Sequence, residues 1–204
     1  MEKIGLTMLF ETLAINNGDI LNLDYHNERF KQGQLFLHCQ TMIDDIADII
    51  NISDEFNNKF IRCRVTYDNY NIKVEYFDYT PKSIQSFKII ECDSIDYAYK
   101  YDDRALLNQL LSQKGDCDEI IIIKNGLVTD CSIGNLLFLK DNHWYTPDTP
   151  LLKGTQRAYL LDTQKVHLAN IDKNNIWQYE KVMMINALNA FDENRAILIK
   201  NIKE

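Results

Sequence analysis

The sequence predicts an α/β protein of the α+β type in two parts, a small N-terminal α+β domain and a larger C-terminal domain rich in strands and also carrying helices. Three observations support this prediction. Short β-branched runs alternate with turn signals such as Asn17-Gly18 and Asn125-Gly126. Apolar residues recur at helical spacing in a few longer segments. The 204 residues suffice for one large domain or two small ones, and we place the boundary between residues 97 and 98.

The N-terminal part, residues 1–97, is predicted to combine an antiparallel sheet with helices on one side. Asp24 is a suitable N-cap for a helix that runs to about Cys39 and is weakened at Gly33. A second stretch with helical spacing runs from Thr41 to Ile50. The strands expected in this part are Leu6–Ile15, Ile20–Leu23, Phe60–Tyr67, Asn71–Tyr79 and Ser86–Cys92.

The C-terminal part, residues 98–204, is organised around Asp130. A β-branched strand, Ile120–Ile123, returns through the Asn125-Gly126 hairpin and delivers Asp130 to a bend before the next apolar strand. A carboxylate between two buried strands needs a partner, so Asp130 is a candidate functional residue. The other expected elements are a helix over Leu106–Leu111, strands over Leu136–Leu139, Lys181–Ile185 and Arg195–Ile202, and a helix from Gly154 to about Lys165.

Composition narrows the class of protein. The net charge is −8 and the 22 basic residues are scattered, which argues against a nucleic-acid partner. No stretch approaches the ~20 apolar residues of a membrane span, and Met1–Gly5 lacks the basic start of a signal peptide, so we expect a cytoplasmic protein. The five cysteines form no Cys-x-x-Cys pair and have no nearby histidine, so we expect reduced thiols and no metal site.

Several short motifs follow one another along most of the chain. They are Leu9-Phe10-Glu11-Thr12, His26-Asn27-Glu28-Arg29-Phe30, Val128-Thr129-Asp130, Gly134-Asn135-Leu136, Tyr145-Thr146-Pro147, Leu152-Lys153-Gly154-Thr155-Gln156-Arg157 and Asn186-Ala187-Leu188. Their order and spacing resemble the class IV aminotransferase family, which includes D-amino-acid and branched-chain aminotransferases and aminodeoxychorismate lyase. The resemblance implies the family's two-domain fold, pyridoxal 5'-phosphate as cofactor, a small amino-acid-like substrate and a homodimer.

The resemblance makes Lys100 the catalytic residue, because the family's Schiff-base lysine lies upstream of the acidic motif with a helix between them. The chemistry needs an amine that is neutral for part of the time, attaches to the cofactor aldehyde and then moves a proton. Lys100 lies among Tyr97, Tyr99 and Tyr101, and packing between aromatic rings would disfavour its charged form. Local sequence alone indicates an ordinary surface lysine. Lys114 and Lys124 are poorer candidates, one beside Gly115 and the other in a hairpin turn.

The resemblance also implies a set of cofactor contacts. Arg29 inherits the family's phosphate arginine, since a guanidinium can hold two phosphate oxygens. Thr155 and Gln156 begin a helix whose first amides can bind phosphate, although the same residues serve any turn and cap, and Asn186 lies in a turn near the phosphate. Asp130 is expected at the pyridine nitrogen, where many members have glutamate. An aspartate bonded only to turn amides remains the alternative.

The substrate is predicted less directly. Thr12 can lie near the cofactor, and Arg62 and Arg64 occupy one face of a strand by the two-residue period, so either could hold a substrate carboxylate; we assign Arg64. Within the family we prefer aminodeoxychorismate lyase, which forms 4-aminobenzoate and pyruvate for folate synthesis. The alternatives are an aminotransferase of D- or branched-chain amino acids, and a binding module that keeps the fold without turnover.

Overall fold

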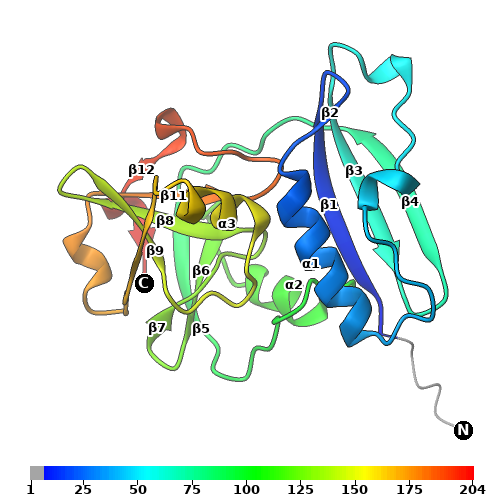
Figure 1. Cartoon of the computed structure of the whole chain (residues 1–204). Coiled ribbons are helices and arrows are strands. Elements are labelled where there is room, and N and C mark those ends of the chain that lie inside the picture. Colours follow the sequence, from blue (N-terminus) through cyan, green and yellow to red (C-terminus); the bar gives the residue numbers. More distant parts are fainter. Residues whose placement is uncertain (1–6) are drawn as a thin grey trace, which may run out of the picture. The chain divides into compact units, whose positions relative to one another are not determined.

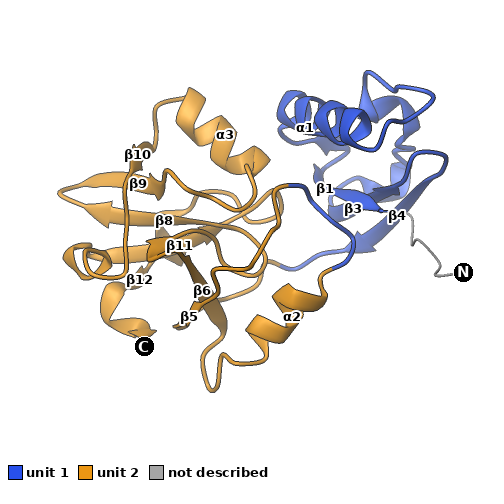
Figure 2. Cartoon of the chain, turned by 90° about the horizontal axis from the view of Figure 1, so that it is seen from below, with its two compact units in different colours: residues 1–80, 99–103 blue, residues 81–98, 104–204 orange. Residues whose placement is uncertain are grey.

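The computed structural model describes residues 7–204. Met1–Gly5 and Leu6, the first residue of the first expected strand, lie outside the described residues. The described chain is a mixed α/β structure (Figure 1) that divides into two compact units (Figure 2). Of the described residues, unit 1 comprises 7–80 and Tyr99–Asp103, and unit 2 comprises Pro81–Ala98 and Arg104–Glu204. No helix in the described part is long and apolar enough to cross a membrane.

Unit 1 is an antiparallel sheet with a helix on one face. Its strands are β1 (Leu9–Asn16), β2 (Asp19–Ile20), β3 (Phe60–Tyr67) and β4 (Ile72–Asp78), in the order β2-β1-β3-β4, and the helix is α1 (Leu23–Phe36). Alternate residues of β1 and β3, including Leu13, Cys63 and Val65, are buried with Phe30 of α1. A Cβ at Gly33 would lie 2.1 Å from the Tyr67 hydroxyl, so this glycine lets α1 pass close to β3.

The structure confirms the strand Phe60–Tyr67 and corrects the helix expected over Thr41–Ile50. Only one 3-10 turn forms there, η1 (Ile46–Ile49), followed by η2 (Asp54–Phe56). The Asp45 carboxylate accepts from the Ala47 amide, and the Asn27 side chain accepts from the Ile46 amide. These contacts fix a loop that buries Ile46 and Ile50 without a full helix, so the apolar spacing was real and the helix prediction was wrong.

The predicted boundary at residue 97 is also wrong. Strand β5 (Phe87–Glu91) pairs in parallel with β6 (Glu119–Lys124), which places residues 81–98 in unit 2 instead of in the N-terminal sheet. The chain then returns briefly to unit 1, where the Phe10 amide donates to the Lys100 carbonyl at 2.9 Å and the Asp102 amide donates to the Met8 carbonyl at 2.9 Å. Backbone pairing therefore attaches residues 99–103 to β1.

Unit 2 contains two sheets and two helices. One sheet has the order β13-β5-β6-β7 and the other β10-β9-β8-β11-β12. The remaining elements are α2 (Ala105–Leu111), β7 (Leu127–Val128), β8 (Asn135–Lys140), β9 (His143–Pro147), α3 (Thr155–Asp162), β10 (His167–Ala169), η3 (Ile176–Gln178), β11 (Lys181–Ile185), η4 (Glu193–Arg195), β12 (Ile197–Leu198), η5 (Ile199–Asn201) and β13 (Ile202–Lys203).

The predictions for the central hairpin and for the C-terminus of unit 2 had different outcomes. Asn125 and Gly126 both have positive φ angles, 51° and 79°, as the turn between β6 and β7 requires, so the hairpin prediction is confirmed. The single final strand expected over Arg195–Ile202 is wrong. β12 pairs with β11 and β13 pairs with β5, which belong to different sheets, so the chain must turn at η5 between them.

Candidate active site

The eight predicted site residues divide equally between the two units. Thr12, Arg29, Arg64 and Lys100 belong to unit 1, and Asp130, Thr155, Gln156 and Asn186 belong to unit 2. Each set is described within its own unit.

Lys100 contacts an aromatic ring that is distant from it in the sequence. Tyr99 stacks on Phe36 of α1, with ring centroids 4.0 Å apart, and Tyr101 meets the same ring edge-on at 6.2 Å. The lysine between them has its Nζ 4.6 Å from the centroid of Phe10 on β1. Alternation along the segment turns both tyrosines toward α1. The Phe10 ring on β1 supplies an aromatic contact to the amine.

Arg29 belongs to a buried cluster with Glu11 and His26. Its Nε donates to Glu11 Oε1 at 2.8 Å and its Nη2 donates to Oε2 at 2.5 Å, while His26 Nδ1 lies 2.9 Å from Oε2. Burial alone would raise the pKa of Glu11, but the Arg29 guanidinium and the His26 ring outweigh it and lower that pKa to about 2. Arg29 thus already holds one carboxylate with its fork, using two of its five N–H donors.

Glu11 received no role from sequence reasoning, although a signal was present. It lies between apolar residues on the inward face of β1, and it is only 1% exposed. An acidic residue at an inward strand position requires a buried cation. The arginine and histidine three residues apart on α1 supply the matching groups on one helix face.

The structure separates the two arginines of β3. Thr12 lies opposite Arg64 in the β1–β3 register, and the two-residue period puts Phe10, Thr12, Arg62 and Arg64 on the same face of the sheet. Arg62 covers the Phe77 ring at 4.4 Å from its centroid. Arg64 instead covers Phe10 at 3.8 Å, the ring that Lys100 also contacts. Arg64 is therefore the arginine that shares an aromatic neighbour with the predicted catalytic lysine.

In unit 2, Asp130 lies at the predicted bend and is 5% exposed. Its Oδ1 accepts from Asn135 Nδ2 at 2.8 Å and its Oδ2 accepts from the Leu152 amide at 2.9 Å. Burial raises the pKa of Asp130 to about 6, despite these hydrogen bonds and the attraction of Arg157. Its neighbours therefore compensate the negative charge only in part.

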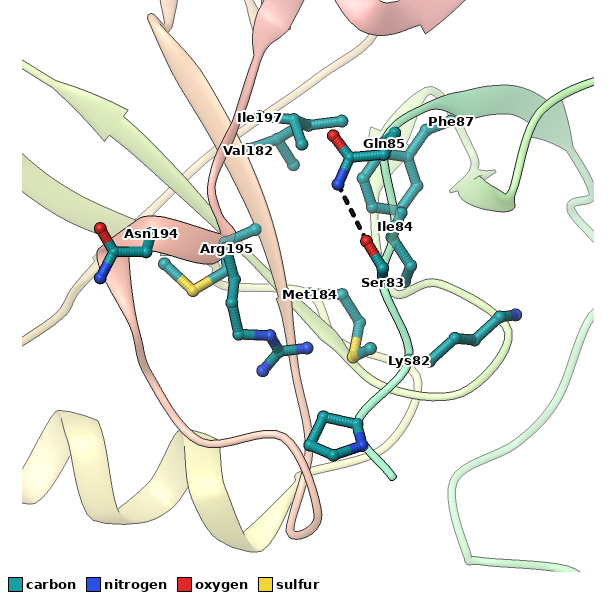
Figure 3. A pocket seen from close by; sticks show the side chains of 12 residues that line it. Lys82, Ser83, Ile84, Gln85, Phe87, Val182, Met184, Asn194, Arg195 and Ile197 are labelled. Carbon is teal, nitrogen blue, oxygen red and sulfur yellow. Dashed lines mark hydrogen bonds between the residues drawn. The ribbon is translucent and has the colours of Figure 1, made fainter. Parts of the chain in front are cut away.

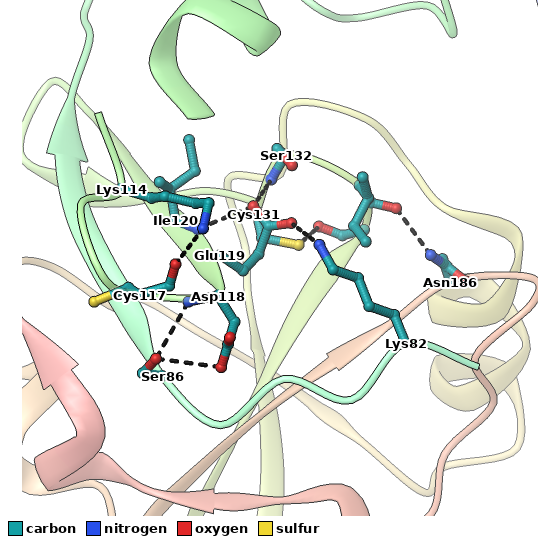
Figure 4. A network of polar contacts seen from close by, with 12 residues as sticks. Lys82, Ser86, Lys114, Cys117, Asp118, Glu119, Ile120, Cys131, Ser132 and Asn186 are labelled. Carbon is teal, nitrogen blue, oxygen red and sulfur yellow. Dashed lines mark hydrogen bonds and ion pairs between the residues drawn. The ribbon is translucent and has the colours of Figure 1, made fainter. Parts of the chain in front are cut away.

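The bend that carries Asp130 is held by side chains that the sequence did not single out (Figure 4). Glu119 at the start of β6 is fully buried, and its Oε1 accepts from the Ser132 amide at 3.3 Å and from the Ile120 amide at 2.9 Å. Its Oε2 lies 3.8 Å from Lys82 Nζ. On the other side of Ser132, Arg104 Nη2 donates to the Ser132 carbonyl at 2.7 Å. In the sequence, the signal for Glu119 was a charged residue at the start of an apolar strand.

Asn186 contributes to the same bend from the end of β11. Its Nδ2 donates to the Ile133 carbonyl at 3.0 Å, and its Oδ1 accepts from the Leu188 amide at 3.0 Å and from Asn189 Nδ2 at 2.8 Å. The side chain that was predicted to contact the cofactor thus joins its own turn to the segment next to Asp130.

The start of α3 lies against this bend. Gly154 is the residue before the helix, and a Cβ there would come within 2.0 Å of Asn135 Oδ1, so glycine allows Asn135 to reach both Asp130 and the Leu152 carbonyl. Thr155 and Gln156 are buried in the first turn, where helix amides face outward from the N-terminus. The helix ends at Asp162, not at about Lys165 as expected.

Unit 2 also has a cavity of about 240 Å³ whose walls include Lys82, Met184 and Arg195 (Figure 3). None of the eight predicted site residues lines it. The Met184 sulfur lies 3.0 Å from where a Cβ would be at Gly134, so this wall packs against the back of the Asp130 bend. The cavity is therefore adjacent to the bend but separate from the candidate side chains.

Comparison with known proteins places these motifs in a family. Residues 98–191 match the family described as amino-transferase class IV. A crystal structure of a "putative 4-amino-4-deoxychorismate lyase" from Haemophilus somnus is 42% identical, with a TM-score of 0.85, and covers 92% of this chain and 100% of its own. The chain belongs to the class IV aminotransferase family. The family resemblance and the fold class predicted from sequence are both confirmed, and the protein is an enzyme.

Two further proteins extend the comparison. An uncharacterized protein of Haemophilus influenzae is 43% identical over 184 residues, which are 89% of this chain and 98% of that protein. The branched-chain amino acid aminotransferase of Escherichia coli shares the fold at 14% identity, with a TM-score of 0.73, over 96% of this chain and 76% of its own. The family implies pyridoxal phosphate as cofactor.

Proposed function

We propose that this class IV aminotransferase binds pyridoxal 5'-phosphate and is an aminodeoxychorismate lyase, which releases pyruvate and forms 4-aminobenzoate for folate synthesis. The observation that carries the cofactor assignment is Asp130, a buried carboxyl with a pKa raised to about 6. A positive charge on a neighbouring ring nitrogen would supply the compensation that its own neighbours leave incomplete. The Asp130 carboxylate is therefore a suitable acceptor for a protonated pyridine nitrogen.

Bound pyridoxal phosphate would supply an electron-accepting ring for bond cleavage next to the substrate amine. In this proposal the Lys100 amine is the covalent attachment point and afterwards takes and returns a proton at the reacting carbon. The Phe10 ring, 4.6 Å away, positions the amine. Asp130 holds the proton on the ring nitrogen, and Glu119 and Asn186 keep the bend of Asp130 in place through the Ser132 amide and the Ile133 carbonyl.

The phosphate is proposed to bind at the start of α3 and at Arg29. The amides of Thr155 and Gln156 lie in the first turn of an eight-residue helix, where partial positive charge accumulates. Arg29, which already holds the Glu11 carboxylate, would add a positive charge. Asn186 is proposed to act near the phosphate through the turn that it fixes.

Support for the lyase over its alternatives comes from the relative at 42% identity, whose name carries that activity. Thr12 and Arg64, facing one another across β1 and β3 beside the ring that Lys100 contacts, are proposed to bind the substrate. Amino transfer to or from D- or branched-chain amino acids is the second candidate, which the fold shared with the E. coli enzyme favours. A homodimer in the cytoplasm is proposed on the family resemblance.

Spectroscopy and product analysis test the proposal. Purified protein titrated with pyridoxal phosphate should gain a visible absorption band, and borohydride should fix the cofactor to the peptide containing Lys100. Aminodeoxychorismate should then yield 4-aminobenzoate and pyruvate when no keto acid is added as amino acceptor. A colourless protein that takes up no cofactor would favour a binding module. Transfer to a keto acid without 4-aminobenzoate would assign the aminotransferase.

A further inference from the structure

The face of the unit 1 sheet that carries Lys100 holds a second cation with its own counter-ion. Arg64 covers one ring, Phe10, at 3.8 Å from its centroid, and Lys100 Nζ lies 4.6 Å from the same centroid. The Arg64 guanidinium also forms an ion pair with Asp102, through Nη2 and Oδ1. Asp102 follows Lys100 by two residues, and its amide is bonded to the Met8 carbonyl. The backbone thus fixes the lysine and the carboxylate to the same strand end.

This ion pair differs from the Glu11–Arg29 pair in its exposure. The side chains of Arg64 and Asp102 are 26% and 36% exposed, whereas Glu11 is 1% exposed. An ion pair in contact with water changes an equilibrium constant by roughly fivefold at most. A ligand carboxylate that meets Arg64 with good geometry can therefore replace Asp102, while no such replacement is favourable at Arg29, whose partner Glu11 is buried.

The neighbouring arginine shows that the arrangement is specific to Arg64. Arg62 lies on the same face, but it covers Phe77, and the described residues place no carboxylate within ion-pair distance of it. Of the two arginines of β3, Arg64 is the one that combines a shared ring with Lys100 and a partly exposed counter-ion.

From these contacts we propose that Arg64 recognises a substrate carboxylate remote from the reacting amine, and that Asp102 occupies Arg64 until that carboxylate displaces it. This inference rests on the proposed function, since it places the substrate next to Lys100. A carboxylate ligand exchanges one ion pair for another at Arg64. A neutral ligand of the same shape leaves Arg64 with Asp102 and gains nothing there. Substrates with a remote carboxylate are therefore selected.

Calorimetric titration of the cofactor-loaded protein with 4-aminobenzoate and with 4-aminobenzamide tests the exchange. We expect the acid to bind roughly 10-fold or more tightly than the amide, as for a hydrogen bond to a charged group. Arg64→Gln should reduce this preference to near one, Arg64→Lys should retain part of it, and the matched control Arg62→Gln should keep it. Asp102→Asn should tighten binding of the acid roughly 2–5-fold and leave the amide unchanged.

Three results would overturn the proposal: no preference for the acid in the wild type, an unchanged preference in Arg64→Gln, or weaker binding of the acid to Asp102→Asn. Circular dichroism of each variant confirms that the fold is intact. Cofactor uptake, followed by absorbance, is a separate reading. A protein that takes up no pyridoxal phosphate but prefers the acid through Arg64 would refute the proposed function alone.

Discussion

Asp130→Asn should change how the stability of the cofactor-free protein depends on pH. In the folded protein burial raises the pKa of Asp130 from the ordinary 3.8 to about 6. Because the folded-state pKa lies above the unfolded one, its stability contribution is complete below about pH 4 and is lost as the pH rises through 6. The difference between the two pKa values corresponds to about 3 kcal/mol of stability at pH 7, from 1.36 kcal/mol per pH unit. The asparagine variant lacks this pH-dependent contribution.

Urea denaturation of both proteins between pH 4 and 7.5 measures the effect. The free energy of unfolding of the wild type minus that of Asp130→Asn should fall by about 2.4 kcal/mol across this range, while titrations common to both proteins cancel. Asp118→Asn is a matched control with the opposite sign, because the Gln85 amide lowers the pKa of Asp118. Saturating pyridoxal phosphate should remove the fall for Asp130. A difference that does not vary with pH would refute the charge imbalance on which the cofactor assignment rests.

The remaining predictions concern three other side chains. Lys100→Ala should lower turnover by orders of magnitude, and borohydride should no longer fix the cofactor to the protein, whereas near-normal turnover would move the attachment to another lysine. Arg29→Ala should lower the free energy of unfolding by about 3–5 kcal/mol in urea, because Glu11 stays buried without its partner. Adding Glu11→Gln should restore stability, and cofactor affinity should stay weak only if Arg29 binds phosphate. Glu119→Ala should cost about 1–3 kcal/mol in urea, whereas Glu119→Gln should be mild because it keeps an acceptor for the Ser132 amide; equal losses would assign the effect to Lys82.

Local signals predicted the elements that local chemistry determines. The Asn125-Gly126 turn fixes its hairpin by backbone conformation, and alternation gave the bounds of β3. Pairing between segments that are distant in the sequence could not be predicted in the same way. The run Ser86–Cys92 has the composition of any strand, and nothing in it shows that β5 pairs in parallel with β6. For the same reason the boundary at residue 97 failed, because the return of residues 99–103 to β1 depends on backbone hydrogen bonds.

The same limit applied to the candidate site. Motif order selected Lys100, Arg29 and Asp130 as candidates, but side-chain partners decide what each group can do. The contact of Lys100 with Phe10 joins residues 90 positions apart, and nothing near Lys100 in the sequence indicates it. The supports of the Asp130 bend, Glu119 among them, were missed because a charge at the start of a buried strand does not reveal which amide it accepts from.

Two of the buried carboxyls, Glu11 and Asp130, differ in how far the protein's own groups balance their charge. Glu11 is almost fully buried, yet its pKa is lowered to about 2 because Arg29 and His26 balance its charge within unit 1. Asp130 is buried to a similar degree in unit 2, yet burial raises its pKa to about 6 because its close donors are an amide side chain and a backbone amide. Ionised Glu11 therefore stabilises the folded chain at neutral pH, and ionised Asp130 opposes it. A bound cation can balance a charge that the protein's own groups leave partly unbalanced. Binding such a cation is the role proposed for Asp130.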